Sequence, residues 1–215
     1  MLEFLSKNYV YLIGFTAQLL FSARLLVQWI KSERVKKVLT PEVFWELSLM
    51  ASFLLFIYGW LRKDFAIMLG QSLTYFIYIR NMQLQHTWEK LPKGLRWFLY
   101  IFPLLVIYFF LNNNRLDIKE LFHNEEISTG LLIWGVLAQI IFTMRFVYQW
   151  FVSEKNKESM LPLGFWILSL TGSAMILIYA VLRKDPVLFV GQIFGFIVYL
   201  RNIIIEIKHR KINEK

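Results

Sequence analysis

Two arginines stand inside apolar segments of this chain, each with a glutamine on either side. Arg24 lies in the stretch QLLFSARLLVQW, and Arg145 lies in the matching stretch QIIFTMRFVYQW. A charged group in apolar surroundings is costly unless it is partnered, and such groups usually face a cavity and mark function. The planar guanidinium fork donates two hydrogen bonds at once, which suits a phosphate or a carboxylate. The two arginines therefore predict a site for an anion.

Other polar residues fall on helical faces close to these arginines. At about 100° per residue, Gln18, Arg24 and Gln28 project within about 120° of one another, and Gln71, Tyr78 and Asn81 project within about 80°. Their amides suit sugar hydroxyls, so the two stripes predict a polar substrate cavity. The predicted substrate-binding residues are Gln18, Arg24, Gln28, Gln71, Tyr78, Asn81, Gln139, Arg145, Gln149, Gln192, Tyr199 and Asn202.

A structural role for the same polar residues is the open alternative. Their side chains could bond across helices within one unit, with Arg24 held by backbone carbonyls or by Glu33. Tryptophans leave the same choice open, because they could stack on a sugar ring or anchor helix ends at a membrane surface. The tryptophans concerned are Trp29, Trp45, Trp150 and Trp166.

Several charged residues outside the stripes have simpler expected roles. Arg80 and Arg201 project away from the glutamine stripe, so we expect their long side chains to reach lipid phosphates. Asp64 and Asp185 are expected to cap helices. Glu46 has no counterpart in the second half of the chain, where Ile167 takes its place, so it is a candidate for proton coupling.

The chain offers few residues for catalysis or metal binding. It has no cysteine and three histidines, which fall in expected loops or near the C-terminus. It has no glycine-rich phosphate loop and no serine nucleophile motif, and its repeated carboxylates fall on opposite sides of the expected topology. We therefore predict neither a catalytic residue, nor a metal site, nor a cofactor.

The composition predicts an integral membrane protein. Hydrophobic residues make up 57% of the 215 residues, against about 45–50% in soluble domains. The apolar residues gather in runs that reach the ~20 residues a helix needs to cross a bilayer. A soluble helical bundle would need polar helix faces that these runs mostly lack. The net charge of +9 suits anionic lipid headgroups and does not indicate a nucleic-acid partner.

Much of the chain is two copies of one unit, 121 residues apart. Gln28-Trp29 recurs at Gln149-Trp150, Ser32-Glu33 at Ser153-Glu154, and the pattern Tyr-x-Arg-Asn ends both copies. Each copy predicts three membrane spans, and the apolar run between them predicts one more. The expected spans are about 8–30, 41–61, 65–85, 129–151, 162–182 and 186–206. The predicted units are therefore residues 8–86, a linker helix at 95–112, and residues 129–206.

An odd number of spans would invert the second copy, and the linker helix restores its direction. The prediction is an all-α membrane fold of seven helices in a 3+1+3 order, with parallel copies. Lysines and arginines are more frequent in the loops after the first span of each copy than in the opposite loops. By the positive-inside rule, the N-terminus is expected outside and the C-terminus in the cytoplasm.

The segment QIIFTMRFVYQWFVSEKNKESMLPLGFWILSLTGSAMILIYAVLRKDPVLFVGQIFGFIVYLRN resembles the lipid-A-disaccharide synthase N-terminal domain family. It carries that family's Gln-x-x-Phe, Gln-Trp, Ser-Glu-Lys, Pro-x-x-Phe-Trp, Gly-Gln and Tyr-x-Arg-Asn pattern. The first copy departs from it, with Arg34 for the lysine and Ala51 where the second copy has Gly172. The architecture is also similar to that of the PQ-loop and SWEET transporters, although no Pro-Gln dipeptide occurs at Pro41 or Pro162.

The resemblance implies a role in the synthesis of lipid A. The family takes its name from a fused glycosyltransferase, but only thirteen residues follow Asn202, so we expect no such domain and no synthase activity. We predict a transporter or flippase in the bacterial inner membrane, with an anionic glycolipid or a polyprenyl-phosphate sugar as substrate. The alternative is a subunit that recruits or presents lipid to a glycosyltransferase.

Overall fold

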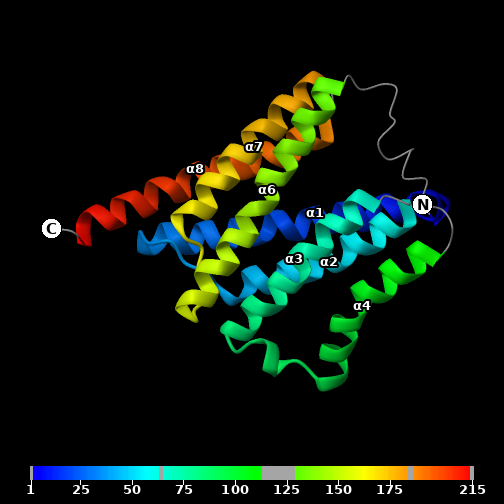
Figure 1. Ribbon diagram of the computed structural model, residues 1–215, viewed down its shortest axis with the longest axis horizontal. Coiled ribbons are helices and arrows are strands. Elements are labelled where there is room, and N and C mark those ends of the chain that lie inside the picture. Colours follow the sequence, from blue (N-terminus) through cyan, green and yellow to red (C-terminus); the bar gives the residue numbers. More distant parts are fainter. Residues whose placement is uncertain (1, 63–64, 113–128, 184–185, 214–215) are drawn as a thin grey trace.

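The computed structural model is all-helical over the residues it describes, which are 2–62, 65–112, 129–183 and 186–213 (Figure 1). A short 3-10 helix at Trp88–Lys90 precedes α4. The α-helices are α1 (Leu2–Val35), α2 (Glu42–Arg62), α3 (Phe65–Leu84), α4 (Lys93–Asn112), α6 (Thr129–Asn156), α7 (Leu163–Arg183) and α8 (Pro186–Asn213).

Prolines begin helices at the predicted places. Pro41 and Pro162 directly precede α2 and α7, and their carbonyls accept hydrogen bonds of 2.9 Å from the amides of Phe44 and Phe165. Pro186 is the first residue of α8, where its fixed φ and missing N–H cost nothing. Helices α1, α6 and α8 run several residues past the ends predicted for them. The predicted caps Asp64 and Asp185 lie outside the described residues.

The helices pack as two groups of three. Helix α2 packs against both α1 and α3, and α7 packs in the same way against α6 and α8. The groups meet through α1 with α8 and through α3 with α6, while α4 packs on α2 and α3. Corresponding helices of the two copies thus make corresponding contacts, as expected for a two-fold relation between similar units.

The two groups meet at one end. Gln28 of α1 bonds to Asn202 of α8, and Asn81 of α3 bonds to Gln149 of α6. All four residues lie toward the C-terminal ends of their helices, so these ends gather together. From this end the two groups diverge toward the N-terminal ends of α1 and α6 (Figure 1).

The loop after the first helix has the same structure in both copies. The backbone turns at Lys36 (φ 55°) and at Lys157 (φ 54°), in the left-handed region. The hydroxyl of Ser32 accepts a hydrogen bond of 2.9 Å from the amide of Leu39. Ser153 accepts the matching bond of 3.1 Å from Met160. The serine of the repeated Ser-Glu pair therefore closes this loop.

Polar residues are buried between the helices, while large apolar side chains face outward. Gln28 and Asn81 are fully buried, whereas Leu19 is 70% exposed and Trp97 is 68% exposed. Among the described residues, three helical segments are long and apolar enough to cross a membrane. These segments are Leu12–Val35, Ile133–Asn156 and Leu163–Leu182.

Helices α6 and α7 are in close contact at Gly172. A Cβ atom added there would lie 2.9 Å from the Cα and from the backbone nitrogen of Phe142, so the helix backbone itself would have to move. The small residue is therefore required by the close helix–helix contact.

Gly172→Val is expected to lower the free energy of unfolding by about 1–3 kcal/mol, because the packed backbone of α6 cannot yield. Unfolding of the detergent-solubilised protein, followed by far-ultraviolet circular dichroism, measures the change. Gly94→Val is the matched control, since a Cβ at Gly94 meets no atom within 4 Å. Equal stability of the two variants would contradict the close contact.

Candidate functional site

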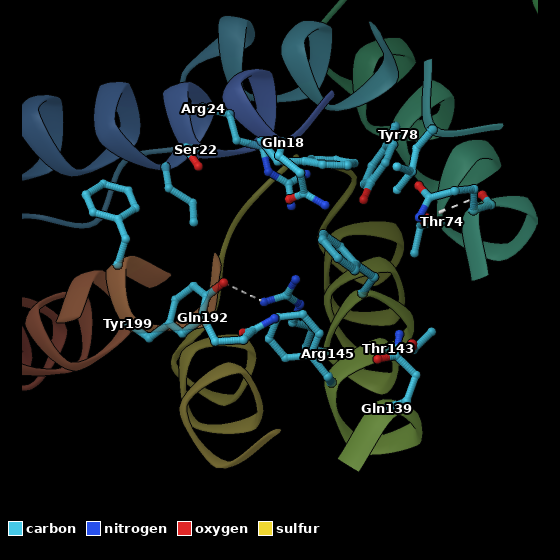
Figure 2. Close-up of a pocket in the computed structure, with 17 residues that line it drawn as sticks. Gln18, Ser22, Arg24, Thr74, Tyr78, Gln139, Thr143, Arg145, Gln192 and Tyr199 are labelled. Carbon is cyan, nitrogen blue, oxygen red and sulfur yellow. Dashed lines mark hydrogen bonds between the residues drawn. The ribbon is translucent and has the colours of Figure 1, made fainter. Parts of the chain in front are cut away.

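A cavity of about 220 Å³ lies between the two helix groups. Its lining comes from both copies, and Figure 2 shows the labelled side chains pointing into the shared space. Ser22, Thr74 and Thr143 add hydroxyls to the lining. The cavity includes eight of the twelve predicted site residues: Gln18, Arg24, Gln71, Tyr78, Gln139, Arg145, Gln192 and Tyr199.

The cavity runs from exposed glutamines to buried arginines. Gln18 and Gln139 are exposed, whereas Arg24 retains 4% of its accessible surface and Arg145 retains 5%. Six positions separate Gln18 from Arg24, which is about 9 Å along a helix. The glutamines therefore mark the open end, and the guanidinium groups lie at the deep end.

Aromatic rings surround both guanidinium groups. The Arg24 guanidinium carbon lies 4.6 Å from the ring centre of Phe21, and that of Arg145 lies 3.5 Å from the corresponding Phe142. Both also lie over Phe146, at 5.4 Å and 4.7 Å. The two carbons are therefore at most about 10 Å apart, the sum of these two distances. Ring faces stabilise cations without neutralising them.

The arginines donate hydrogen bonds to neutral hydroxyls. Arg24 Nη1 donates to Ser48 Oγ at 2.6 Å, and Arg145 Nη1 donates to the Tyr199 hydroxyl at 2.9 Å. Both bonds join two helices of the same copy, as the structural alternative expected, but the partners of Arg24 and Arg145 are hydroxyls rather than backbone carbonyls or Glu33. The Nε atoms of both arginines are buried without a hydrogen-bond partner.

The cavity has an uncompensated positive charge. None of the described residues that line it is acidic. A buried charge without a counter-charge is costly, and the aromatic and hydroxyl neighbours supply only dipoles and quadrupoles. The arrangement can therefore accept an anion through its arginines, and hydroxyl or amide groups through its glutamines.

The other four predicted site residues lie outside this cavity. Gln28 Nε2 donates to Asn202 Oδ1 at 2.8 Å, and Asn202 Nδ2 returns a bond of 3.1 Å. The matching Asn81–Gln149 pair has bonds of 2.7 Å and 3.1 Å. We call these two pairs the amide clamp. They close the structure behind the arginines, so a single cavity lined by all twelve residues was not found.

Two ion pairs lie beyond the amide clamp. Arg80 donates two bonds of 2.8 Å to Glu154, and Arg201 donates bonds of 2.8 Å and 2.6 Å to Glu33. The prediction that Arg80 and Arg201 reach lipid phosphates was therefore wrong in this structure. Both arginines instead join the two copies, because each meets a carboxylate of the other copy.

Two of the four tryptophans belong to the core. Trp45 and Trp166 are fully buried, so they neither face a ligand nor anchor a helix at a surface. Trp45 Nε1 donates to Ser159 at 2.7 Å, and Ser159 donates to Asn81 at 2.8 Å. Trp45 thereby supports the amide clamp.

Glu46 lies away from the central cavity. It borders an apolar groove between α2 and α4, with neighbours such as Met50 and Phe98. Glu46 is therefore not among the residues that line the cavity with the two arginines.

Sequence reasoning missed Ser48, the ion pairs, and the aromatic cage, by which we mean the rings of Phe21, Phe142 and Phe146 around the two guanidinium groups. The ion pairs left a usable signal, because Glu33 and Arg80 both recur at the common offset of 121 residues. A repeated acid and a repeated base at the same expected membrane side can pair across copies. The cage left a weaker signal, since phenylalanines are frequent throughout this chain.

These features define an internally duplicated all-helical protein whose two halves share one cationic cavity. The sequence model of the Lipid A Biosynthesis N-terminal domain matches residues 13–83 and 134–204. The chain therefore belongs to this family, which confirms the resemblance found in the sequence.

Curated relatives carry the name lipid-A-disaccharide synthase. That of Chlamydia felis is 27% identical over 215 residues, which cover 95% of this chain and 34% of the relative. That of Chlamydia pneumoniae is 29% identical over 186 residues, which cover 83% of this chain and 30% of the relative. The chain thus spans about a third of the length of these relatives. No solved structure gave a significant match.

Removing an asparagine of the amide clamp should destabilise the protein unequally in the two copies. Asn202→Ala is expected to cost about 1 kcal/mol, because the Gln28 amide loses a buried partner. Asn81→Ala should cost about 2 kcal/mol, because Asn81 also accepts the Ser159 hydroxyl. Unfolding titrations with sodium dodecyl sulfate measure both. Asn156→Ala, which alters an exposed asparagine, should be neutral, and an equal cost in all three would contradict the clamp.

A charge exchange tests the ion pairs between the copies. Arg80→Glu alone places two carboxylates together and should lower stability, and Arg80→Glu with Glu154→Arg should recover most of the loss. The expected coupling is about 0.5–1 kcal/mol, because both side chains are partly exposed. The same cycle on Glu33 and Arg201 should give a similar coupling. Strictly additive effects in both cycles would show that the contacts do not hold the copies together.

Proposed function

We propose that this protein spans the bacterial inner membrane with two parallel three-helix repeats and one linker helix. The expected units are residues 8–86, 95–112 and 129–206. The outward apolar side chains and the three candidate spans support this arrangement. The gathering of the C-terminal ends of α1, α3, α6 and α8 supports parallel copies. The N-terminus lies outside and the C-terminus in the cytoplasm, as the loop charges favour.

Within this membrane arrangement, the cavity binds the anionic headgroup of a glycolipid or of a polyprenyl-phosphate sugar. The observation that carries this proposal is the pair of buried arginines, Arg24 and Arg145, which face one cavity that no described carboxylate lines. Arg24 lies twelve residues from one end of its candidate span and eleven from the other, and so does Arg145. Charged groups at this depth are typical of a substrate path.

Moving that headgroup across the membrane is the function that we favour. The lining includes the exposed Gln18 and Gln139 at one end, and the amide clamp lies beyond the arginines at the other, which supports an opening on the glutamine side. A site at mid-span that is open to one side is typical of carriers. The family's description, Lipid A Biosynthesis N-terminal domain, supports a lipid of that pathway as the substrate.

A non-transporting role is the second candidate. The relatives named lipid-A-disaccharide synthase are about three times as long as the matched region. A domain of this kind could recruit or present a lipid to a glycosyltransferase, either on the same chain or as a partner. In that role the cavity binds the same headgroup, but the headgroup does not cross the membrane.

Translocation in liposomes tests the favoured function. Purified protein is reconstituted with a fluorescent, phosphate-bearing glycolipid, and dithionite bleaching reports the headgroups that reach the outer leaflet. We expect translocation to fall at least tenfold in Arg24→Gln and in Arg145→Gln, because each removes a charged hydrogen-bond donor. Arg34→Gln is the control, since Arg34 lies on the same helix but is exposed.

Binding measured on the same samples separates the two candidates. Binding that depends on Arg24 and Arg145 without any translocation would favour the presenting role. Translocation at the same rate in all variants would reject the cavity as the path.

A further inference from the structure

We infer that the ligand is held through a dianionic group, a phosphate monoester or a diphosphate, placed between Arg24 and Arg145. This inference rests on the proposed function, because it names the chemical class of the headgroup that the cavity takes. Three properties of the cavity support it: its charge, the spacing of the two arginines, and the hydrogen-bond donors that remain on them.

The charge of the lining requires two negative charges. Arg24 and Arg145 contribute two positive charges, and no described lining residue is acidic. The carboxylates of Glu33 and Glu154 are already engaged by Arg201 and by Arg80, beyond the amide clamp. A monoanion, such as a carboxylate or a phosphodiester, would leave one buried guanidinium without a counter-charge. A dianion compensates both. This argues against a sugar linked to a polyprenyl monophosphate, which is a phosphodiester, and favours a glycolipid with a phosphate monoester or a diphosphate.

The spacing fits one phosphorus centre or two linked ones. The two guanidinium carbons lie 5.4 Å and 4.7 Å from the ring centre of Phe146, and are thus at most about 10 Å apart. A guanidinium that bonds a phosphate places its carbon roughly 4 Å from phosphorus, so two of them on one phosphate lie about 8 Å apart. A diphosphate spans a slightly larger separation. A single phosphate falls within this limit, and a diphosphate does so when the two guanidinium groups approach it at an angle.

The remaining donors match phosphate oxygens. The Nη1 atom of Arg24 donates its hydrogen bond to Ser48, and that of Arg145 donates to Tyr199. The Nε atoms, both buried, have no partner. Nε and Nη2 form the edge of the fork that binds two oxygens side by side. The hydroxyl contacts therefore orient each guanidinium, and the Nε donor of this edge is unused in both arginines.

The test compares lipids that differ in headgroup charge. Purified wild-type protein in detergent is titrated with dioctanoyl phosphatidic acid, a phosphate monoester, and with dioctanoyl phosphatidylglycerol, a phosphodiester. The rise in melting temperature reports binding. At pH 7.5 we expect at least tenfold tighter binding of the monoester. The preference should shrink below about pH 6, where the monoester becomes a monoanion.

The variants assign the preference to the two arginines. Arg24→Gln and Arg145→Gln should each lower the preference for the monoester about tenfold, and Arg34→Gln should leave it unchanged. Arg24→Lys keeps the charge but loses the fork, so it should retain part of the preference, and it guards against a variant that fails to fold. A preference that is unchanged in both glutamine variants would overturn the inference.

The outcomes separate this inference from the proposed function. Equal binding of both lipids that is lost in Arg24→Gln overturns the dianion and keeps an anionic headgroup site. Absence of binding by either lipid overturns the dianion site, whereas the proposed function fails only if the fluorescent glycolipid is also neither bound nor translocated. Glucose 1-phosphate, titrated in parallel, distinguishes a lipid from a free phosphate. If it binds as tightly as phosphatidic acid, the dianion is supported and the case for a lipid is removed.

Discussion

The amide clamp is the contact on which the rest of the structure depends. Gln28 and Asn202 exchange hydrogen bonds, and so do Gln149 and Asn81, so each copy supplies one member of each pair. Because the bonds are reciprocal, they fix both the distance and the relative rotation of the two copies. They lie at one end only. The cavity exists because the helices are held together here and diverge beyond it (Figure 1).

The clamp also explains why the arginines are tolerated. Gln28 donates to Ser32 and to the Leu39 carbonyl as well as to Asn202, so the clamp is tied to the loop behind it. This network fills the space between the two copies on the side of the arginines away from the cavity. The guanidinium groups therefore face the aromatic cage and the cavity. Arginine in this position is costly alone, and the surrounding rings and hydroxyls lower that cost without removing the charge. The residual charge is what makes the cavity a candidate site.

Most of the helices, and the pairing of the polar stripes, could be predicted from the sequence. The prolines before α2 and at the start of α8 mark boundaries because their geometry acts locally. The repeat made the matched residues visible. The division between cavity and clamp could not be predicted, because Gln28 lies on the same helical face as Arg24 and differs from it only in depth. How deeply each of these residues is buried depends on where the second copy packs against the helix, and this tertiary contact cannot be read from the periodicity of one helix. The pairing of Arg80 with Glu154 also depends on this contact, but the recurrence of both residues at the common offset was a signal for it.

The two copies differ where the cavity and the clamp need them to differ. Phe146 stands where the first copy has Leu25, and its ring serves both guanidinium groups. Ser159 stands where the first copy has Val38, so only one half of the clamp gains the additional bond from Trp45. The charged residues keep the two-fold relation in position, while these neighbours break it. The bonds of the two arginines differ as well, because Arg24 donates to Ser48 and Arg145 donates to Tyr199. A symmetric pair of charges in an asymmetric lining suits a ligand that carries a compact dianion on an irregular body. The repeat thus provides the two positive charges of the cavity, and the sequence differences between the copies determine the shape of its lining.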